Sequence, residues 1–377
     1  MKIKSIKAVS ANFLRPDKSY DSVSKESRPS WNDRPVANPM TRYPRYAKSR
    51  PSWMPNWENF GCLIEAEDGN WGFAVANHGK PVATIIDEYL GPRLIGENCM
   101  AIEKIYDMMV RMGSPYGATG LHSYAVSAID LALWDLKGKL LNQPIYELLG
   151  GKVRDSVPVY ASSMKRDLTP YEEAVRATGL VEKGYKGYKL HSAVPGKIDD
   201  SADQTIKTVT EVRKAVGDDI DILVDVNGAY SIHHSIEIGK KLEDLGVFHF
   251  EEPRPHYDLE GLSKVANALD IPVASGENIY SEYEYKDLIL KGKVDIIQPD
   301  IVKTPGFTTF LKIAEIASVL GVPITCHNTQ PIISTVAHAH FVAATVGVPY
   351  AQEYNIEHVS IRDDYPILSD PLNIKDG

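Results

Sequence analysis

The second half of the chain consists of eight short apolar runs separated by amphipathic stretches with a helical period. Between residues 157 and 355 the runs read VPVYASS, GYKLH, IDILVDVN, VFHFEEP, IPVASGEN, VDIIQPD, VPITCHN and PYAQEYN. Strand-like runs that alternate with helical patterns are typical of βα units in a parallel sheet. We therefore expect an α/β fold whose main domain, residues 151–355, is a (β/α)7β TIM-like barrel.

The first 150 residues have a different pattern. The start of the chain alternates like a strand, and FGCLIEAEDGNWGFAVA (residues 60–76) is typical of two strands joined by a tight turn. Helical patterns follow over Pro81–Met112 and Tyr124–Leu149, and the second is followed by two glycines, which commonly end helices. The sequence thus predicts an α+β module over residues 1–150.

Two segments have no regular period. Residues 15–58 are rich in Pro, Arg, Ser and aromatic side chains. An irregular segment of that length in a compact protein is usually a lid or a binding loop, and its Trp, Tyr and Arg content argues against disorder. Residues 356–377 are rich in Asp and Pro, and we expect them to pack back on the protein as a C-terminal tail.

The composition is that of a soluble globular protein, with 43% hydrophobic and 24% charged residues. The net charge of −9 argues against a nucleic-acid-binding surface, which normally has a basic face. No segment approaches the ~20 apolar residues of a membrane span, and the N-terminus lacks the apolar core of a signal peptide. The three cysteines are scattered, which argues against a disulfide framework. We expect a cytoplasmic protein without nucleic-acid or membrane partners.

A polar side chain stands at the carboxyl end of six of the apolar runs, at nearly constant intervals. The separations along the chain are 26, 26, 23, 27 and 26 residues. A βα unit is about 30 residues, so each interval advances one strand around the barrel, and the six side chains point into the mouth where barrel active sites lie. One acidic residue at a strand end is often only the N-cap of the next helix, but six in register favour an active site. The six are Asp225, Glu251, Glu277, Asp300, His327 and Glu353.

Three carboxylates come first in this register: Asp225, Glu251 and Glu277. Carboxylates that converge in a half-buried mouth repel one another, and a divalent cation removes the repulsion. An all-carboxylate set with room for water favours Mg²⁺, or Mn²⁺, over zinc, which prefers histidine and cysteine ligands. The sequence therefore predicts a magnesium site formed by these three residues.

The next two positions, Asp300 and His327, fall on adjacent predicted strands. Adjacency places them within reach of each other, so that Asp300 can orient His327 and raise its basicity. A lone histidine after an apolar run is usually a core residue. An acid/base role for His327 is favoured because it is in register with the other polar residues at the strand ends.

On the second run, Lys189 and His191 are two residues apart and share a face. If that face points into the mouth, both are cationic or proton-transferring groups opposite His327. The alternative for His191 is an exposed position at the strand end. Asn227 shares the face of Asp225 and is a candidate for contact with metal or substrate. The sequence leaves open which of Lys189, His191 and His327 acts as the base.

These motifs resemble those of the enolase superfamily, in the branch that includes mandelate racemase and the acid-sugar dehydratases. The resemblance covers nearly the whole chain and rests on SAIDLALWDLKGKLLNQPIYELLGG (Ser127–Gly151), DVN, FEEP, SGEN, QPD and the histidine of the seventh run. It implies that residues 1–150 are a capping domain that determines substrate specificity. It also implies that the C-terminal tail, residues 356–377, completes this capping domain.

The resemblance implies roles for individual residues as well. The implied Mg²⁺ ligands are Asp225, Glu251 and Glu277, with Glu252 behind them. The implied acid/base dyad is Asp300 with His327. Glu353 is implied as a hydrogen-bond donor or orienting group near the substrate carboxylate, and Lys189 as a group that contacts the substrate.

A loop in the first module, NPMTRYPRYAKSR (Asn38–Arg50), resembles the capping-domain loop of L-rhamnonate dehydratases and their relatives. The arginine that corresponds to Arg50 reaches the substrate there, which implies a substrate-binding role for Arg50. The second run reads Lys189-Leu190-His191 and departs from the Lys-x-Lys pattern of mandelate racemases; rhamnonate dehydratases also lack the second lysine. No histidine stands just before the Trp31 region, where rhamnonate dehydratases carry one, so D-arabinonate and L-fuconate are open as substrates.

Together these features predict a Mg²⁺-dependent hydro-lyase for an aldonic acid. Such an enzyme removes the C2 proton and the C3 hydroxyl and releases a 2-keto-3-deoxy acid. A racemase or epimerase, which uses the same metal and the same proton abstraction, is the alternative. A non-catalytic carbohydrate-binding barrel is a more remote one, since it has no need for three metal ligands and a dyad. Relatives assemble as dimers to octamers, so the resemblance implies a homo-oligomer.

Overall fold

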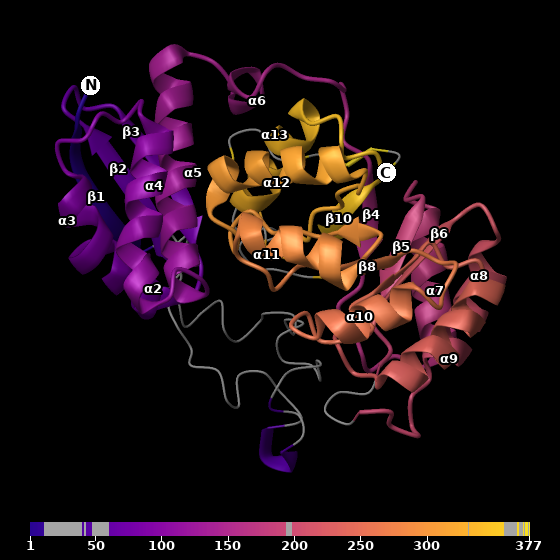
Figure 1. Ribbon diagram of the computed structural model, residues 1–377. Coiled ribbons are helices and arrows are strands. Elements are labelled where there is room, and N and C mark those ends of the chain that lie inside the picture. The colour runs from indigo at the N-terminus through magenta and orange to yellow at the C-terminus, as the bar shows by residue number, and fades with distance from the viewer. Residues whose placement is uncertain are drawn as a thin grey trace.

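The computed structural model describes residues 1–10, 40, 43–46, 60–193, 198–330, 332–357, 368, 372, 374, 375 and 377. Within these residues the chain forms two modules that lie side by side (Figure 1). The first is an antiparallel sheet with helices, and the second is a parallel sheet curled into a barrel. Residues 15–58, the predicted lid or binding loop, lie outside the described residues except at 40 and 43–46, and Arg50 lies outside them too.

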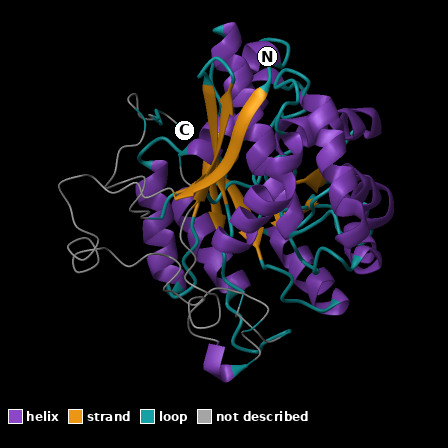
Figure 2. Cartoon of the chain, turned by 90° about the vertical axis from the view of Figure 1, so that its left-hand side faces the viewer, coloured by secondary structure: helices purple, strands orange, loops and turns teal. Residues whose placement is uncertain are grey.

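The sheet of the first module has the strand order β1-β2-β3. β1 (Ile3–Ser10) pairs antiparallel with β2 (Phe60–Ala66), which pairs antiparallel with β3 (Trp71–Ala76). Figure 2 looks at the molecule from this side and shows the strands lying next to one another. In the predicted turn between β2 and β3, Gly69 has φ 86°, a left-handed conformation that glycine adopts without strain.

The helices of the first module follow its sheet. They are α2 (Gly79–Thr84), η4 (Ile85–Leu90), α3 (Gly91–Leu94), α4 (Ile102–Gly113), η5 (Ser114–Tyr116), α5 (Leu121–Leu141) and α6 (Ile145–Leu148). The helical pattern predicted over Pro81–Met112 is divided, because Ile95 leaves the helical region (ψ 132°) and Gly96 has φ 85°. The next helix also ends earlier than predicted, at Asn142, whose φ is 51°.

The barrel strands form one parallel sheet in the order β10-β4-β5-β6-β7-β8-β9. They are β4 (Val159–Ser162), β5 (Gly187–Leu190), β6 (Asp221–Asp225), β7 (His249–Glu251), β8 (Val273–Ser275), β9 (Ile296–Ile297) and β10 (Gln352–Asn355). The connecting helices are α7 (Pro170–Val181), α8 (Thr205–Val216), α9 (Ile232–Asp244), α10 (Leu259–Ala266), α11 (Glu282–Asp287) with η6 (Leu288–Gly292), α12 (Gly306–Leu320) and α13 (Ile333–Ala344).

The seventh apolar run, VPITCHN, joins the barrel without forming a strand of its own. Ile324 bridges to Ile297 of β9 in parallel, and the amide of Thr325 donates to the Ile297 carbonyl at 3.0 Å. On the other side, the amide of Cys326 donates to the side-chain oxygen of Gln352 in β10 at 2.8 Å. The run therefore closes the barrel between β9 and β10, and the predicted (β/α)7β order is confirmed.

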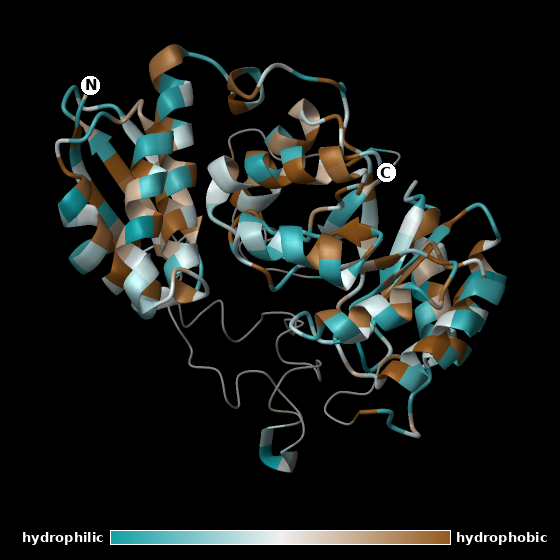
Figure 3. Cartoon of the chain, viewed as in Figure 1, coloured by the Kyte–Doolittle hydropathy of each residue, from teal (hydrophilic) through white to brown (hydrophobic). Residues whose placement is uncertain are grey.

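The helices of both modules carry hydrophilic and hydrophobic residues side by side along their length (Figure 3). In α8, Val209 and Val212 are buried while Lys214 is exposed. This is the pattern of helices that cover a sheet with one face and meet solvent with the other. Among the described residues, no helix is both long enough and apolar enough to cross a membrane.

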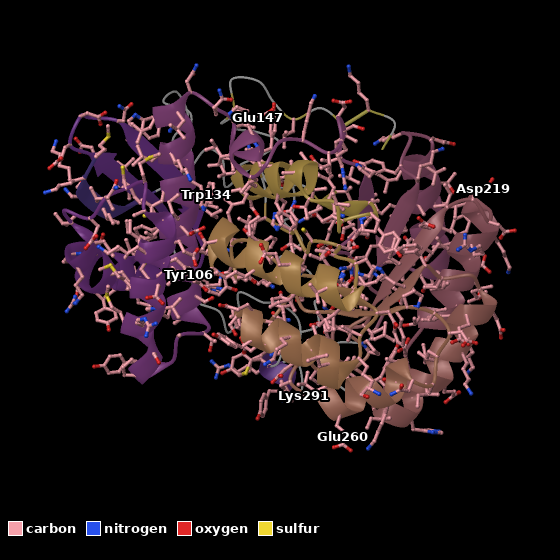
Figure 4. All side chains as sticks on the ribbon, turned by 45° about the horizontal axis from the view of Figure 1, so that its top comes forward. Tyr106, Trp134, Glu147, Asp219, Glu260 and Lys291 are labelled. Carbon is pink, nitrogen blue, oxygen red and sulfur yellow. The ribbon has the colours of Figure 1, made fainter. Side chains whose placement is uncertain are left out.

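Helix α5 joins the two modules, since it packs on β3 and on α12. Trp134 of α5 lies edge-on to Phe307 with ring centroids 5.9 Å apart, and the Tyr106 hydroxyl of α4 lies 3.3 Å from a carboxylate oxygen of Glu282. Figure 4 shows Tyr106 and Trp134 on the side of the first module that faces the barrel. One apolar core therefore continues from the antiparallel sheet into the barrel.

The position of the C-terminal tail is described only in part. The carbonyl of Gly377 accepts a hydrogen bond from the amide of Val159 in β4 at 3.0 Å, and Ile374 packs against an apolar cluster of the barrel. Both of these contacts are with the barrel. The predicted packing of the rest of the tail on the capping domain concerns residues that are mostly outside the described ones, and it stays a prediction.

The start of α12 offers a test of the contact between the modules. Gly306 has φ 61°, and a Cβ there would lie 2.2 Å from Oδ2 of Asp130. Asp130 is buried in α5 and its carboxylate accepts from the amide of Thr308 at 3.2 Å and from the hydroxyl of the same residue. We expect Gly306→Ala to lower the free energy of unfolding by ~2–4 kcal/mol, from left-handed strain and from the displaced carboxylate.

The other end of the same helix supplies the control. Gly321 has φ 71° with no atom within 4 Å of an added Cβ, so Gly321→Ala costs only the left-handed strain, ~1–2 kcal/mol. Urea unfolding of both variants measures the difference. Equal losses in the two variants would show that the contact between Gly306 and Asp130 has no energetic weight.

Candidate active site

The six side chains in register lie at the carboxyl ends of the barrel strands. Asp225 and Glu251 are paired neighbours at the ends of β6 and β7, and the other four follow around the mouth in chain order. The Glu277 side chain is 14% exposed, and the other five side chains are at most 5% exposed. The structure thus brings together the residues that the spacing singled out.

Asp225, Glu251 and Glu277 form what we call the carboxylate cluster. One oxygen of each lies within 4.8 Å of the others. Within the described part of the chain, Oε2 of Glu251 is buried without a hydrogen-bond partner, and Nε2 of His249 lies 3.4 Å from it. A buried anionic oxygen without a donor is costly unless a cation binds it. Converging carboxylate oxygens fit the ligand preferences of Mg²⁺ and Mn²⁺, so this cluster could hold such an ion.

Lys189 of β5 reaches the carboxylate cluster from one side. Its Nζ lies 2.5 Å from Glu251 Oε1, 3.3 Å from Asp225 Oδ2 and 3.2 Å from Glu353 Oε1. Burial lowers the pKa of Lys189, but the three carboxylates outweigh burial and raise it well above its usual range. Lys189 is therefore an ammonium that balances the cluster. A cation bound by these carboxylates would weaken their effect on the pKa of Lys189.

His191 follows on the same face of the second run. The structure turns it inward, with 3% of its side chain exposed, so it is not an exposed strand-end residue. Its Nε2 lies 2.9 Å from Asp225 Oδ2, and its Nδ1 lies 2.6 Å from the carbonyl oxygen of Ser163. With both ring nitrogens engaged, His191 orients Asp225 in this structure, and its proton-transfer role stays a prediction.

Asn227 holds Asp225 from the other side. Its amide donates to Asp225 Oδ1 at 2.8 Å, and its side-chain nitrogen donates to Oδ2 at 3.3 Å. Its own side-chain oxygen accepts a hydrogen bond from the Arg166 guanidinium. The predicted contact of Asn227 with substrate stays a prediction. Arg166 was not found from the sequence because it lies beyond the first apolar run and outside the register.

Asp300 and His327 are hydrogen-bonded to each other. Nδ1 of His327 lies 2.8 Å from Asp300 Oδ2, and its Nε2 lies 2.8 Å from Glu277 Oε2. Burial lowers the pKa of His327, but the charge of Glu277, with Glu353 and the Asp300 hydrogen bond, raises it to about 10. A cation held by Glu277 would weaken this attraction and bring the pKa of His327 closer to neutral pH, where imidazole exchanges protons.

Glu353 of β10 links the two sides of the site. Its Oε1 lies 3.2 Å from Lys189 Nζ and accepts from the Ser162 hydroxyl at 2.7 Å. Its Oε2 accepts from the amide of Asn328 at 2.8 Å and lies 4.0 Å from His327 Nε2. Burial raises the pKa of Glu353, but Lys189 and His327 outweigh burial and lower it. Glu353 is therefore an ionised acceptor that orients its neighbours.

Further polar residues lie beside Glu277. Lys303 Nζ lies 3.7 Å from Glu277 Oε1 and donates to Asn278 Oδ1 at 3.4 Å. The Asn278 side-chain nitrogen donates to Glu277 at 2.9 Å and to Glu252 at 3.3 Å. Burial, with the charges of Glu277 and Asp225, raises the pKa of Glu252 well above its usual range. Lys303 was not predicted from the sequence, where its one signal is its place three residues after Asp300.

Residues 64–150 match the mandelate racemase / muconate lactonizing enzyme N-terminal domain, and residues 172–377 match the enolase C-terminal domain-like family. The second match alone covers more than half of the chain.

Individual relatives agree with these matches. The chain is 32% identical to the arabinonate dehydratase of Saccharolobus solfataricus over 322 residues, which are 83% of each protein. It is 29% identical to the L-rhamnonate dehydratase of Saccharopolyspora erythraea over 98% of the chain and 90% of that protein. A mandelate racemase/muconate lactonizing protein from Paracoccus denitrificans, solved in complex with magnesium, has a TM-score of 0.81 and 30% identity, covering 100% of this chain and 92% of that one. The chain belongs to the enolase superfamily, with the N- and C-terminal domains of the mandelate racemase/muconate lactonizing enzyme group.

Proposed function

We propose that this protein is a Mg²⁺-dependent dehydratase of an aldonic acid. The observation that carries the proposal is the placement of two proton-transferring groups on different sides of one carboxylate cluster. Lys189 contacts the cluster at Glu251, and His327, oriented by Asp300, contacts it at Glu277. The names of two relatives, arabinonate dehydratase and L-rhamnonate dehydratase, support this substrate class.

In the proposed reaction the C2–H bond breaks and its proton passes to a base, for which Lys189 and His327 are the candidates. The C3–O bond then breaks, and the leaving hydroxide takes a proton from His327 and departs as water. The remaining enol tautomerises to a 2-keto-3-deoxy acid. A Mg²⁺ ion held by Asp225, Glu251 and Glu277 would supply positive charge next to the substrate carboxylate. Positioned acid/base groups contribute ~10²- to 10⁴-fold each.

The test is a screen of mono- and diacid sugars with the purified protein and Mg²⁺, carried out in D₂O. We expect an aldonic acid to give a semicarbazide-reactive keto acid. A racemase or epimerase would instead return the substrate with deuterium at C2. If no acid sugar gives a keto acid and none exchanges its C2 proton, the proposed function is wrong.

The metal requirement can be measured without substrate. A ligand that binds only the folded state raises stability by about 2.7 kcal/mol at a concentration of 100 times its Kd. We expect the melting temperature to rise with Mg²⁺ and to fall back when EDTA is added. In Glu277→Gln this response should be lost, because one of the three carboxylate ligands is gone.

Glu260→Gln is the matched control for that experiment, because Glu260 pairs with Lys264 on the solvent face of α10 and its side chain is 82% exposed. This variant should respond to Mg²⁺ as the unaltered protein does. An unaltered protein whose melting temperature does not change with Mg²⁺ or Mn²⁺ would contradict the metal site.

A further inference from the structure

The residue that follows Asp300 has both of its backbone polar groups held by side chains. The amide of Ile301 donates to Nε2 of His338 at 3.1 Å, and its carbonyl accepts from the hydroxyl of Ser127 at 2.7 Å. His338 belongs to α13 of the barrel, and Ser127 belongs to α5 of the first module, the capping module (residues 1–150). Ile301 is fully buried, so these two side chains take the place that water has at an exposed turn.

His338 is a buried imidazole outside the carboxylate cluster and the dyad; only 3% of it is exposed. Its Nδ1 lies 2.9 Å from the carbonyl oxygen of Ser334 one turn earlier in α13. That nitrogen must carry the proton, which leaves Nε2 as the acceptor for the amide of Ile301. Burial lowers the pKa of His338, which favours the neutral ring that this arrangement needs.

The turn at Ile301 determines the direction of the Asp300 carboxylate. Oδ1 of Asp300 accepts from the amide of Val302 at 2.9 Å, while Oδ2 faces Nδ1 of His327 at 2.8 Å. The carbonyl of Asp300 also accepts from the amide of Thr304 at 2.8 Å. A shift of the peptide at Ile301 therefore rotates the carboxylate relative to the imidazole that it orients.

The capping module holds this turn at a second point. The hydroxyl of Ser123, one helical turn before Ser127 in α5, donates to the carbonyl of Lys303 at 2.7 Å. Both serines are buried. Two hydroxyls on one face of α5 thus hold two carbonyls of the segment that follows Asp300, so the alignment of the dyad depends on both modules.

We propose that His338 and Ser127 are positioning residues that align the Asp300–His327 dyad by holding the peptide of Ile301 from the barrel and from the capping module. Neither residue touches the reacting atoms in this arrangement. The expected effect of His338 and Ser127 on turnover rests on the proposed function, whereas their expected effect on the Asp300–His327 hydrogen bond does not. Partners that hydrogen-bond to metal-binding residues and orient them typically contribute ~10- to 100-fold to activity, and we expect an effect of that size for these two residues.

The test compares His338→Gln with His338→Leu, because a glutamine oxygen can replace Nε2 as acceptor whereas leucine cannot. The first readout is the far-downfield NMR signal of the proton between His327 and Asp300, recorded without substrate. The second is the split between kcat and KM. We expect His338→Leu and Ser127→Ala to shift or broaden the signal and to lower kcat ~10- to 100-fold at nearly constant KM, and we expect His338→Gln to retain most of both.

His340→Leu is the matched control, since His340 lies two residues further along α13 and stacks on Tyr146 of α6 with ring centroids 5.7 Å apart. It should leave the signal and kcat unchanged. A folded His338→Leu or Ser127→Ala protein with the unaltered signal would overturn the proposal, and so would a His338→Gln variant as impaired as His338→Leu. If His338→Leu does not fold, Ser127→Ala decides. If no acid sugar is turned over, the NMR signal still decides, and only the proposed function fails.

Discussion

Replacing His327 with asparagine is expected to lower kcat by ~10²- to 10⁴-fold, which is the contribution of a positioned general acid or base. Asparagine can keep a polar contact with Asp300, but it cannot exchange a proton where Nε2 of His327 stands, 2.8 Å from Glu277. The three carboxylates remain in this variant, but a positive charge beside Glu277 is removed, so Mg²⁺ should bind at least as tightly as in the unaltered protein. Steady-state formation of the keto acid and calorimetric titration with Mg²⁺ measure the two effects separately.

The same substitution at His340, in α13 on the outside of the barrel, controls for the loss of an imidazole as such. His340→Asn should retain full turnover. A His327→Asn protein that still eliminates water at the unaltered rate would remove His327 from the reaction. If that variant lost elimination but still exchanged the C2 proton in D₂O, Lys189 would be the base and His327 the acid.

The positions of the six residues at the barrel mouth could be predicted because they follow from the length of one βα unit. A βα unit has a nearly fixed length, so residues such as Asp225 and Glu251, which are 26 residues apart, end adjacent strands. Strand parity also placed Lys189 and His191 on one face, and the structure turns both inward. These inferences need only local geometry and the order of the strands.

Other features depend on tertiary contacts that no local pattern contains. Arg166 and Lys303 lie in segments after strands. Hydrogen bonds to Asn227 and Asn278 set the direction of their side chains. On the side of β9, the seventh run pairs through a single bridge, between Ile324 and Ile297. On the side of β10, the side chain of Gln352 holds it by a hydrogen bond. A sequence pattern cannot distinguish that arrangement from a regular strand.

The division of the predicted helix over Pro81–Met112 also depends on a contact with the sheet. The run has helical periodicity on both sides of Gly96, and one glycine inside a helical pattern is often tolerated. Here Gly96 takes φ 85°, and Asn98 pairs with Lys2 next to β1. The contact with the sheet therefore overrides the local pattern, and it could not be inferred without the fold.

The strongest effect on stability is expected from Lys189→Met in the absence of metal. The ammonium of Lys189 is the only Lys or Arg cation within 4.0 Å of Asp225, Glu251 or Glu353 among the described residues. Removing it leaves buried carboxylates facing one another. Breaking a buried ion pair by removing one partner costs ~3–5 kcal/mol, and we expect a loss of this size from the free energy of unfolding in EDTA.

Mg²⁺ should reverse much of that loss, because a divalent cation can carry the charge that Lys189 no longer supplies. It should also bind the variant more tightly, since the repulsion between the ammonium and the metal is gone. The increase in melting temperature on adding Mg²⁺ is therefore expected to be larger in Lys189→Met than in the unaltered protein. Lys264→Met, which removes an exposed i,i+4 pair with Glu260, should change stability by less than ~0.5 kcal/mol in either condition. Equal melting of Lys189→Met and the unaltered protein in EDTA would mean that the carboxylate cluster does not depend on Lys189 for its charge balance.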